Sequence, residues 1–479
     1  MAALAGAKPK FRRVYYEIEK ALDIYSVVIL LGLRKTGKSE ILKQLAQVKG
    51  GYYHDFKASK LSYEEAEELF ELKEPLLLLD EVGYLDCFDL FMSSLLEKAA
   101  QARKKVVITS SSYGSMKQLG SEHLGGGRSY KAELFPLSFE EYLHFSREGF
   151  AYGDDYEPAE QDVEDFYRLI NVPLGMDFVI DRQYMMDTFN DIEAARGNRY
   201  QDERDVVLTP LQYASVLDVI AYTLNDNISM KRLTGSRVGN QEFVTTKGLP
   251  MSQSLISLAT KIVNKMAREI EDDIGIGDIA HIVAYLYHAG FLFVDLIVGN
   301  GQGRSSAHIM AELGAVKTYD QFKNFFTNYN FSVISPLIYT RLLVDLERIA
   351  GELYTNAGLR GCLYELAVKS ESVCRKGYDL FHDSRKYKSP TVEIDLFERG
   401  LLFEATVRHK KDKEYWVDKV MEDHELIRVL TDMPGVWKDE GAFFRIGYPK
   451  ALLMVSNGTI RSLEARKVPT DYSLHKQQI

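Results

Sequence analysis

The sequence contains few cysteines, little proline and no long apolar run. Its 479 residues include three cysteines, Cys87, Cys362 and Cys374, which form no CxxC pair. This excludes a disulfide framework and favours a reducing compartment. Glycine (34) and proline (12) are too few for a collagen-like or low-complexity chain. The longest apolar runs, Ser26–Leu33 and Leu76–Leu79, fall well short of the roughly 18 residues of a membrane span.

The chain also lacks an excess of basic residues. Asp and Glu outnumber Lys and Arg by 69 to 59, which gives a net charge of −10. A uniformly basic, nucleic-acid-coating surface is therefore excluded, although a local basic groove is compatible with this total. The first ten residues lack the apolar core of a secretory signal. We expect a soluble, cytoplasmic protein without a membrane partner, and at about 150 residues per domain roughly three domains.

The first 150 residues or so alternate short apolar runs with amphipathic stretches, which is typical of an α/β domain with a parallel sheet. Helices are expected at Ser62–Leu72 and Leu90–Ala102. The expected strands are Ser26–Gly32, Gly51–Phe56, Leu76–Asp80, Lys105–Ser110 and Tyr130–Phe135.

A mostly helical region is expected to follow this α/β part. Gly153–Asp165 carries seven acids and no base, which is typical of a solvated face or a linker. Amphipathic helices are expected at Ser252–Ile270 and Ile276–His288, and an apolar strand at Phe291–Val298. Two helices followed by a strand fit the end of a winged helix and fit a plain helical linker domain equally well. Gly299–Arg304 is the clearest linker.

The segment GLRKTGKS fits the phosphate-loop pattern G-x-x-x-x-G-K-[ST] and stands between an apolar strand and a helix. Its glycines allow backbone N–H groups to turn towards phosphates at a helix N-terminus, where the helix dipole favours anions. Lys38 is expected to reach the β- and γ-phosphates, and Ser39 to ligate Mg²⁺. The candidate nucleotide-binding residues are Gly32, Arg34, Lys35, Thr36, Gly37, Lys38 and Ser39.

A second polar site follows the strand Leu76–Leu79, which ends in Asp80 and Glu81. Nucleotide hydrolysis needs such a pair, Asp80 to hold Mg²⁺ through water and Glu81 to polarise the attacking water. Acids also commonly follow buried strands as plain surface groups. The next strand ends in hydroxyls, so Ser110 or Ser111 is a candidate for orienting the water or for capping the strand. No guanine-selecting NKxD tetrapeptide occurs, which favours ATP over GTP.

These motifs together resemble a known family. GLRKTGKS, LLLLDEVGYL, VVITSSS and GGGRSYKAELFPLSFEEYL follow the order seen in AAA-type ATPases of bacterial and archaeal origin. The last segment is the most specific, because Gly127-Arg128, Leu134–Phe139 and Glu141 are similar to that family's GR and PLSF-x-E signature. The resemblance implies a P-loop ATPase domain, a helical and winged-helix middle and a C-terminal restriction-endonuclease-like domain. It also implies that Arg128 contacts the γ-phosphate, in cis or from a neighbouring subunit, with a salt-bridging surface arginine as the alternative.

A predicted hairpin at Thr391–Val407 carries the second candidate site. Alternation places Asp395 and Glu404 on one face, and two carboxylates suit a hard divalent ion that activates water for phosphodiester cleavage. Together with Glu365 they resemble the D…(D/E)-x-K core of restriction-endonuclease-like enzymes. The sequence departs from that core at Thr406, where the family has a lysine, and a threonine cannot supply the cation. A polar outer face of a hairpin is the alternative interpretation.

Basic stretches lie near this hairpin. Arg385–Lys388 and Arg408–Lys413 have aromatic neighbours and offer a surface for DNA or RNA, although most such runs are solvated faces. The sequence therefore predicts an ATP-binding, Mg²⁺-dependent AAA-type ATPase whose nucleotide state controls a nuclease-like domain. The alternative is a nucleotide-gated switch that binds DNA or a partner protein with an inactive nuclease-like domain.

The predicted architecture is α/β with four segments. Residues 1–150 form the P-loop ATPase domain, 151–298 a helical region with the candidate winged helix, 299–357 a linker and mixed segment, and 358–479 a restriction-endonuclease-like α/β domain. Oligomers are common among AAA-type ATPases, but the sequence identifies no subunit interface.

Overall fold

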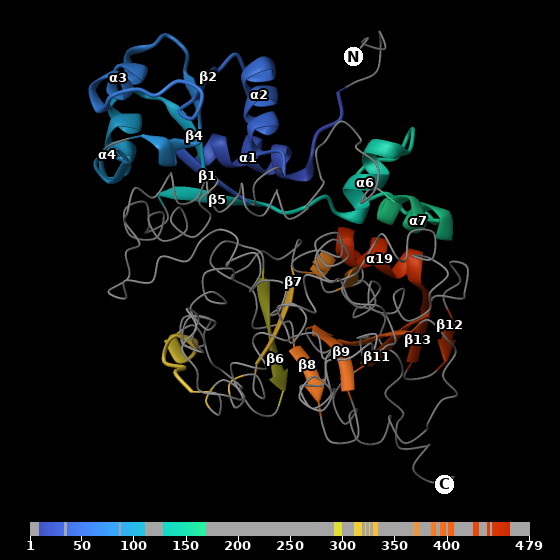
Figure 1. Ribbon diagram of the computed structural model, residues 1–479. Helices are drawn as coiled ribbons and strands as arrows, with labels where there is room; N and C mark the ends of the chain where they lie inside the picture. Colours follow the sequence, from blue (N-terminus) through green and yellow to red (C-terminus); the bar gives the residue numbers. More distant parts are fainter. Residues whose placement is uncertain are drawn as a thin grey trace, which may run out of the picture.

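The computed structural model describes an N-terminal body in detail and the C-terminal part chiefly as a sheet (Figure 1). The described residues are 9–32, 36–85, 88–110, 128–168, 292–298, 311–318, 321, 325, 329–333, 367–368, 370–372, 385–388, 393–398, 401–406, 425–430, 438–440 and 443–459. Within these residues, no helix is both long enough and apolar enough to cross a membrane.

A five-stranded sheet forms the centre of the N-terminal body. Its strands are β1 (Val27–Gly32), β2 (Tyr52–Asp55), β3 (Leu76–Asp80), β4 (Lys105–Thr109) and β5 (Ser129–Leu134). They lie in the order β2-β3-β4-β1-β5, and every neighbouring pair is parallel. Strands β1 and β3 are buried over their whole lengths, which explains why their sequences are continuous apolar runs and do not alternate. The predicted parallel-sheet α/β domain is confirmed, with each strand within one residue of its expected bounds.

Helices α2 (Lys38–Lys49), α3 (Tyr63–Glu68) and α4 (Phe88–Gln101) connect these strands, with short 3-10 turns η1 (Leu69–Glu71) and η2 (Val82–Tyr84). Helix α3 begins with a capping box. The Ser62 hydroxyl accepts from the Glu65 N–H at 3.2 Å, and the Glu65 carboxylate accepts from the Ser62 N–H at 2.7 Å. The helix predicted at Ser62–Leu72 therefore consists of α3 and η1.

Helix α1 (Arg13–Ile24) was missed by the sequence reasoning. Its buried residues recur at helical spacing and pack in the same apolar cluster as β1 and α2. They are Val14, Tyr15, Ile18, Ala21 and Leu22. This periodicity is the signal that could have identified the helix.

The strand order determines where functional groups gather. Strand β4 lies between β1 and β3, and all three run in the same direction. Their carboxyl ends therefore meet at one edge of the sheet, which is where open α/β sheets bind ligands. The phosphate-loop segment, Asp80 and Ser110 all follow strands at this edge.

The C-terminal part contains an eight-stranded mixed sheet in the order β12-β13-β11-β10-β9-β8-β6-β7. Its strands are β6 (Leu292–Val298), β7 (Tyr329–Val333), β8 (Arg385–Lys388), β9 (Glu393–Glu398), β10 (Leu401–Thr406), β11 (Glu425–Leu430), β12 (Lys438–Glu440) and β13 (Phe443–Gly447). The predicted hairpin is present, because β9 and β10 pair antiparallel with Glu398 opposite Leu401.

Strand β6 belongs to the C-terminal sheet, because it pairs parallel with β8 and antiparallel with β7. The sequence left two interpretations open for this strand, the end of a winged helix and part of a helical linker domain. The sheet therefore extends across the expected segment boundaries after residues 298 and 357. The helices predicted at Ser252–Ile270 and Ile276–His288, and the linker Gly299–Arg304, lie outside the described residues.

Three helices join the two parts of the chain. Helices α6 (Phe139–Ser146) and α7 (Glu160–Arg168) follow the five-stranded sheet, and α19 (Tyr448–Asn457), which follows β13, packs against both (Figure 1). The Lys450 ammonium of α19 donates to the Asp155 carboxylate at 2.7 Å and to the Tyr156 carbonyl at 2.8 Å.

The acidic segment Gly153–Asp165 is thus a contact surface and not only a solvated linker. Asp155 and Glu157 pair with Lys450 of α19. Asp162 is buried and pairs with Arg147, which follows the last residue of α6. Its carboxylate also accepts a hydrogen bond from the Ala159 N–H and so caps the start of α7. Of the remaining acids of the segment, Asp154 and Glu160 are exposed, and Glu164 and Asp165 are half-buried.

Glu371, from a helical stretch in the C-terminal part, also contacts α6. Its carboxylate accepts from the Phe139 N–H at 2.9 Å, at the first residue of α6. Burial raises the pKa of Glu371 from its ordinary value of 4.5 to about 7, although hydrogen bonds from Ser456 and Phe139 oppose the shift. This helical stretch is described at residues 367, 368 and 370–372.

This raised pKa predicts a pH-dependent stability. Between pH 4.5 and about 7 the folded chain holds a proton on Glu371 that the unfolded chain releases. The contribution of this group to the free energy of unfolding is therefore full below pH 4.5 and is lost as the pH rises through about 7. Thermal unfolding at pH 5 and pH 8 should show that Glu371→Gln loses less stability over this interval than the parent. The exposed Glu148→Gln is the control and should follow the parent.

Candidate nucleotide site

The loop between β1 and α2 is shaped by two glycines. Gly32 ends β1, where a Cβ atom would lie 2.4 Å from the Leu134 carbonyl oxygen of β5, so no side chain fits. Gly37 is the N-cap of α2 and has φ 102°, a left-handed conformation that favours glycine. Thr36 is buried beside it. Leu33, Arg34 and Lys35 lie outside the described residues.

Lys38 is the first residue of α2 and is only 5% exposed. Its ammonium group donates to the Gly32 carbonyl at 3.0 Å, so the side chain folds back across the loop. A buried cation at the positive end of a helix dipole creates a region that attracts anions. The loop therefore has the electrostatics of a phosphate site.

Asp80, at the end of β3, lies next to this loop. Its side chain is fully buried, and the Tyr53 hydroxyl donates to its Oδ2 at 2.7 Å. Burial raises the pKa of Asp80 above its ordinary value, hydrogen bonds from Ser39 and Tyr53 oppose this, and the charge of Glu81 adds to it. Because Ser39 belongs to the phosphate-loop segment, its contact with Asp80 places the Asp80–Glu81 pair next to that loop. Tyr53 was not identified from the sequence.

Ser39 and Asp80 fit a magnesium ion. The Oδ1 atom of Asp80 is buried and has no hydrogen-bond partner among the described residues. A carboxylate and a hydroxyl are oxygen ligands of the kind that Mg²⁺ takes, together with waters and substrate phosphates. Within the described part of the chain no group of three or more His, Cys, Asp or Glu residues forms a separate metal site.

Glu81 has a strained backbone. It has φ 52° and ψ 43°, in the left-handed region, and leads into η2. This conformation costs a non-glycine residue about 1–2 kcal/mol, and such strain is concentrated at functional sites. The side chain is half-buried.

The end of β4 supplies hydroxyl groups between the two strands that carry the loop and Asp80. Ser110 is 1% exposed, and Ser111 lies outside the described residues. Thr109, the last residue of β4, is fully buried, and its Oγ1 has no partner in the described portion. Sequence reasoning passed over Thr109 because it was counted as part of the strand, although a hydroxyl at a strand end was the available signal.

Arg128 lies at the wrong edge of the sheet for a contact in cis. It is exposed and directly precedes β5, whose first residue, Ser129, pairs with Val27 at the start of β1. The phosphate loop begins at the other end of β1, where Gly32 pairs with Leu134. Six residues of strand span about 20 Å, further than an arginine side chain reaches. Contact from a neighbouring subunit is the form of the prediction that remains.

The second candidate site is described only at the backbone. Asp395 lies on β9 and Glu404 on the adjacent antiparallel β10, and the paired residues Leu396 and Phe403 are their immediate neighbours. Thr406 ends β10 opposite Leu430 of the parallel β11. Glu365 lies outside the described residues.

Replacing Glu81 distinguishes the effect of its strained backbone on stability from the effect of its carboxylate on ATP turnover. Glu81→Gly should keep or raise the free energy of unfolding, by up to about 1 kcal/mol, because glycine tolerates the left-handed backbone. The same variant should lose ATP turnover with the carboxylate. Arg103, at φ 53° after α4, is the matched control. Arg103→Gly should resemble Glu81→Gly in thermal unfolding but keep the parent's rate of phosphate release. An equal loss of turnover in both variants would contradict the role of Glu81 in hydrolysis.

One family profile matches the N-terminal part of the chain. A family profile described as an AAA domain matches residues 25–143. No curated protein matches the chain.

Three solved structures are distantly similar to this chain. A Walker-type ATPase of Pyrococcus abyssi is 16% identical, with 60% of this chain and 93% of that chain covered and a TM-score of 0.30. AMPPCP-bound DnaA from Aquifex aeolicus is 16% identical, with 58% and 84% covered and a TM-score of 0.25. A RuvB variant of Thermotoga maritima is 12% identical, with 65% and 93% covered and a TM-score of 0.28.

The profile match, the parallel five-stranded sheet and the phosphate-loop sequence between β1 and α2 agree with one another. The profile covers the strands β1 to β5 and ends within α6. Residues 25–143 are thus similar to an AAA domain in sequence, and they have the parallel sheet and the phosphate-loop sequence of a P-loop α/β domain.

Proposed function

We propose that this protein binds ATP with Mg²⁺ at the β1–α2 loop and hydrolyses it. The observation that carries the proposal is the contact between Ser39 and the buried Asp80, whose Oδ1 atom has no hydrogen-bond partner among the residues that the structure describes. A fully buried carboxylate is costly unless a cation or hydrogen bonds compensate it. Mg²⁺ bound with ATP would supply that cation.

Each residue then has a defined task. The N-terminus of α2 and Lys38 bind the phosphates, for which Lys38 leaves the Gly32 carbonyl. Ser39 and Asp80 hold Mg²⁺, which neutralises charge on the phosphates. Glu81 polarises the attacking water, and a hydroxyl at the end of β4, from Ser110 or Thr109, orients it.

The proposed role of Arg128 requires an oligomer. Because Arg128 is too far from the phosphate loop of its own chain, we propose that it stabilises the γ-phosphate bound to a neighbouring subunit. A ring or filament of subunits would place the amino edge of one sheet near the carboxyl edge of the next.

Two substitutions test the ATPase directly. Lys38→Ala should weaken ATP binding about 10- to 100-fold, because it removes a charge-assisted contact to phosphate. Glu81→Gln should bind ATP within about twofold of the parent and lose turnover by about 100-fold or more. A fluorescent ATP analogue measures binding, and phosphate release measures turnover.

Lys49→Ala, at the opposite end of α2, is the control and should change neither quantity. If Lys38→Ala hydrolysed ATP like the parent, the phosphate site would be wrongly assigned.

The nucleotide state is further proposed to control the C-terminal sheet, which we interpret as nuclease-like. The favouring observation is the antiparallel β9–β10 pair, which puts Asp395 and Glu404 on adjacent strands. β10 then pairs parallel with β11, a connection that requires a crossover. Thr406, which cannot act as the missing lysine, favours the alternative of a nucleotide-gated switch that binds DNA, RNA or a partner protein.

The absence of a lysine at position 406 gives a prediction for this second site. Incubation of DNA and RNA with the full chain, with Mg²⁺ or Mn²⁺ and with or without ATP, should give a mobility shift without cleavage. Cleavage that is lost in Asp395→Ala and kept in Glu398→Ala, at the end of the same strand, would overturn the switch in favour of a nuclease.

A further inference from the structure

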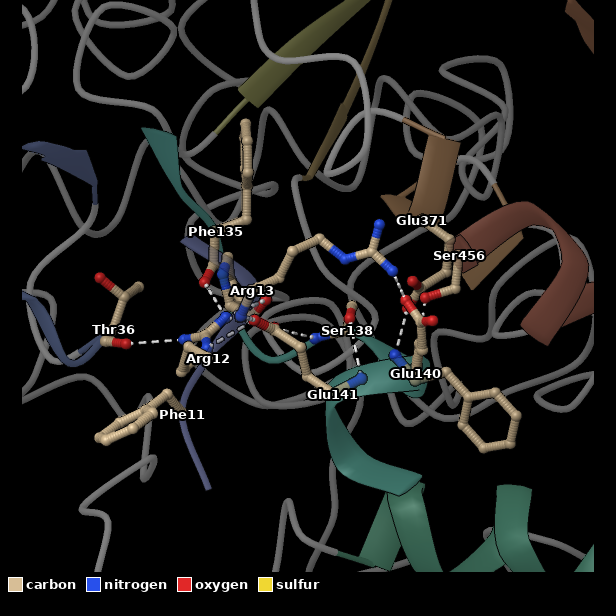
Figure 2. A network of polar contacts seen from close by, with 12 residues as sticks. Phe11, Arg12, Arg13, Thr36, Phe135, Ser138, Glu140, Glu141, Glu371 and Ser456 are labelled. Carbon is tan, nitrogen blue, oxygen red and sulfur yellow. Dashed lines mark hydrogen bonds and ion pairs between the residues drawn. The ribbon is translucent and has the colours of Figure 1, made fainter. Parts of the chain in front are cut away.

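A buried arginine ahead of the AAA-type domain contacts the phosphate loop. Arg12 is 8% exposed and precedes α1, outside the residues that match the family profile. Its Nη1 donates to the Thr36 carbonyl at 2.8 Å, and its Nη2 donates to the Phe135 carbonyl at 3.0 Å (Figure 2). Arg12 therefore ties the phosphate loop to the segment after β5.

Glu141 is the counter-ion of this arginine. Its two carboxylate oxygens accept from Nε and Nη2 of Arg12, and they also accept from the backbone N–H groups of Arg13 and Ser138. Although burial alone would raise the pKa of Glu141, the charge and hydrogen bonds of Arg12 lower it below its ordinary value. Ser138 and Glu141 also form the capping box of α6. The PLSF-x-E segment thus has a structural task, which is to present an ionised carboxylate to Arg12.

The Thr36 contact acts on the nucleotide site through the geometry of one peptide. The peptide between Thr36 and Gly37 is planar and trans, so its N–H points opposite to its C=O. By holding the Thr36 carbonyl, Arg12 directs the Gly37 N–H away from itself. That N–H belongs to the glycine that caps α2.

The start of α6 is at the same time held by the C-terminal part of the chain. The Phe139 N–H donates to the Glu371 carboxylate at 2.9 Å, and the Glu140 N–H donates to the Ser456 hydroxyl at 3.1 Å. Figure 2 shows this contact beside the Arg12 cluster, with Arg13 paired to the buried Glu140 between them. Glu140 and Glu141 are consecutive, so a shift at one is transmitted to the other.

We propose that Arg12 is a positioning residue of the nucleotide site and that the Arg12–Glu141 pair couples nucleotide binding to the seating of Glu371 and Ser456 on α6. The proposal rests on the proposed ATP binding. Buried hydrogen-bonded networks shift between discrete arrangements and do not deform gradually, which makes them suited to such coupling. Coupling is reciprocal, so a change at Ser456 must alter ATP affinity by the factor with which ATP alters this contact.

The first test addresses positioning. Arg12→Lys keeps the buried charge beside Glu141 but removes the planar fork that reaches Thr36. ATP affinity should fall by roughly fivefold or more. Arg13→Lys, which keeps its pairing with Glu140 and does not touch the loop, is the matched control and should stay within about twofold. A loss of thermal stability with unchanged ATP affinity in Arg12→Lys would show a merely structural role and overturn the assignment.

The second test addresses coupling in the full chain. Ser456→Ala removes only a hydroxyl and should change the dissociation constant of ATP by about twofold to fivefold. In the background of Arg12→Lys the same substitution should have no effect, because the link is already broken. Lys450→Ala is the control. It removes the contact of α19 with Asp155 but no contact with α6, so ATP affinity should stay near the parent's.

The outcomes are distinguishable. If the parent binds ATP and the effects of Arg12→Lys and Ser456→Ala simply add, or Ser456→Ala has none, the coupling is wrong and the ATPase proposal stands. If the parent binds no ATP or analogue in the presence of Mg²⁺, both proposals are wrong.

Discussion

A buried guanidinium needs a counter-ion and hydrogen-bond acceptors, and Arg12 obtains them from the phosphate loop, the segment after β5 and the start of α6. Glu141 provides the charge, and the carbonyls of Thr36 and Phe135 accept the remaining donors. Removing one partner of such a pair leaves an uncompensated buried charge and costs about 3–5 kcal/mol. The N-terminal segment, the phosphate loop and the start of α6 therefore hold their positions together.

The direction of the strands is the second constraint. In a parallel sheet all carboxyl ends lie at one edge, so Lys38, Asp80 and Thr109 come together although they follow different strands. The same rule places Arg128 at the opposite edge, next to the start of β1. Hydrolysis that uses Arg128 would therefore require a second subunit, and the oligomeric state becomes part of the mechanism.

Much of the N-terminal body could be predicted from local pattern. Continuous apolar runs identified β1 and β3, and the spacing of Gly32, Gly37 and Lys38 identified the phosphate loop. The role of Arg12 could not be predicted, because its partner Glu141 is 129 positions away and nothing local distinguishes it from a surface arginine. The pairing of β6 with β8 could not be predicted for the same reason, since a strand's own sequence does not identify the strands beside it.

Backbone hydrogen exchange of the full chain, with and without Mg²⁺ and a non-hydrolysable ATP analogue, is the decisive measurement of the link between the nucleotide site and α6. We expect slower exchange at residues 36–40 of the phosphate loop and, through Arg12 and Glu141, at the first turn of α6 and in α19. Unchanged exchange at residues 36–40 would contradict the nucleotide site itself. Slowing confined to those residues would contradict the link to the C-terminal part.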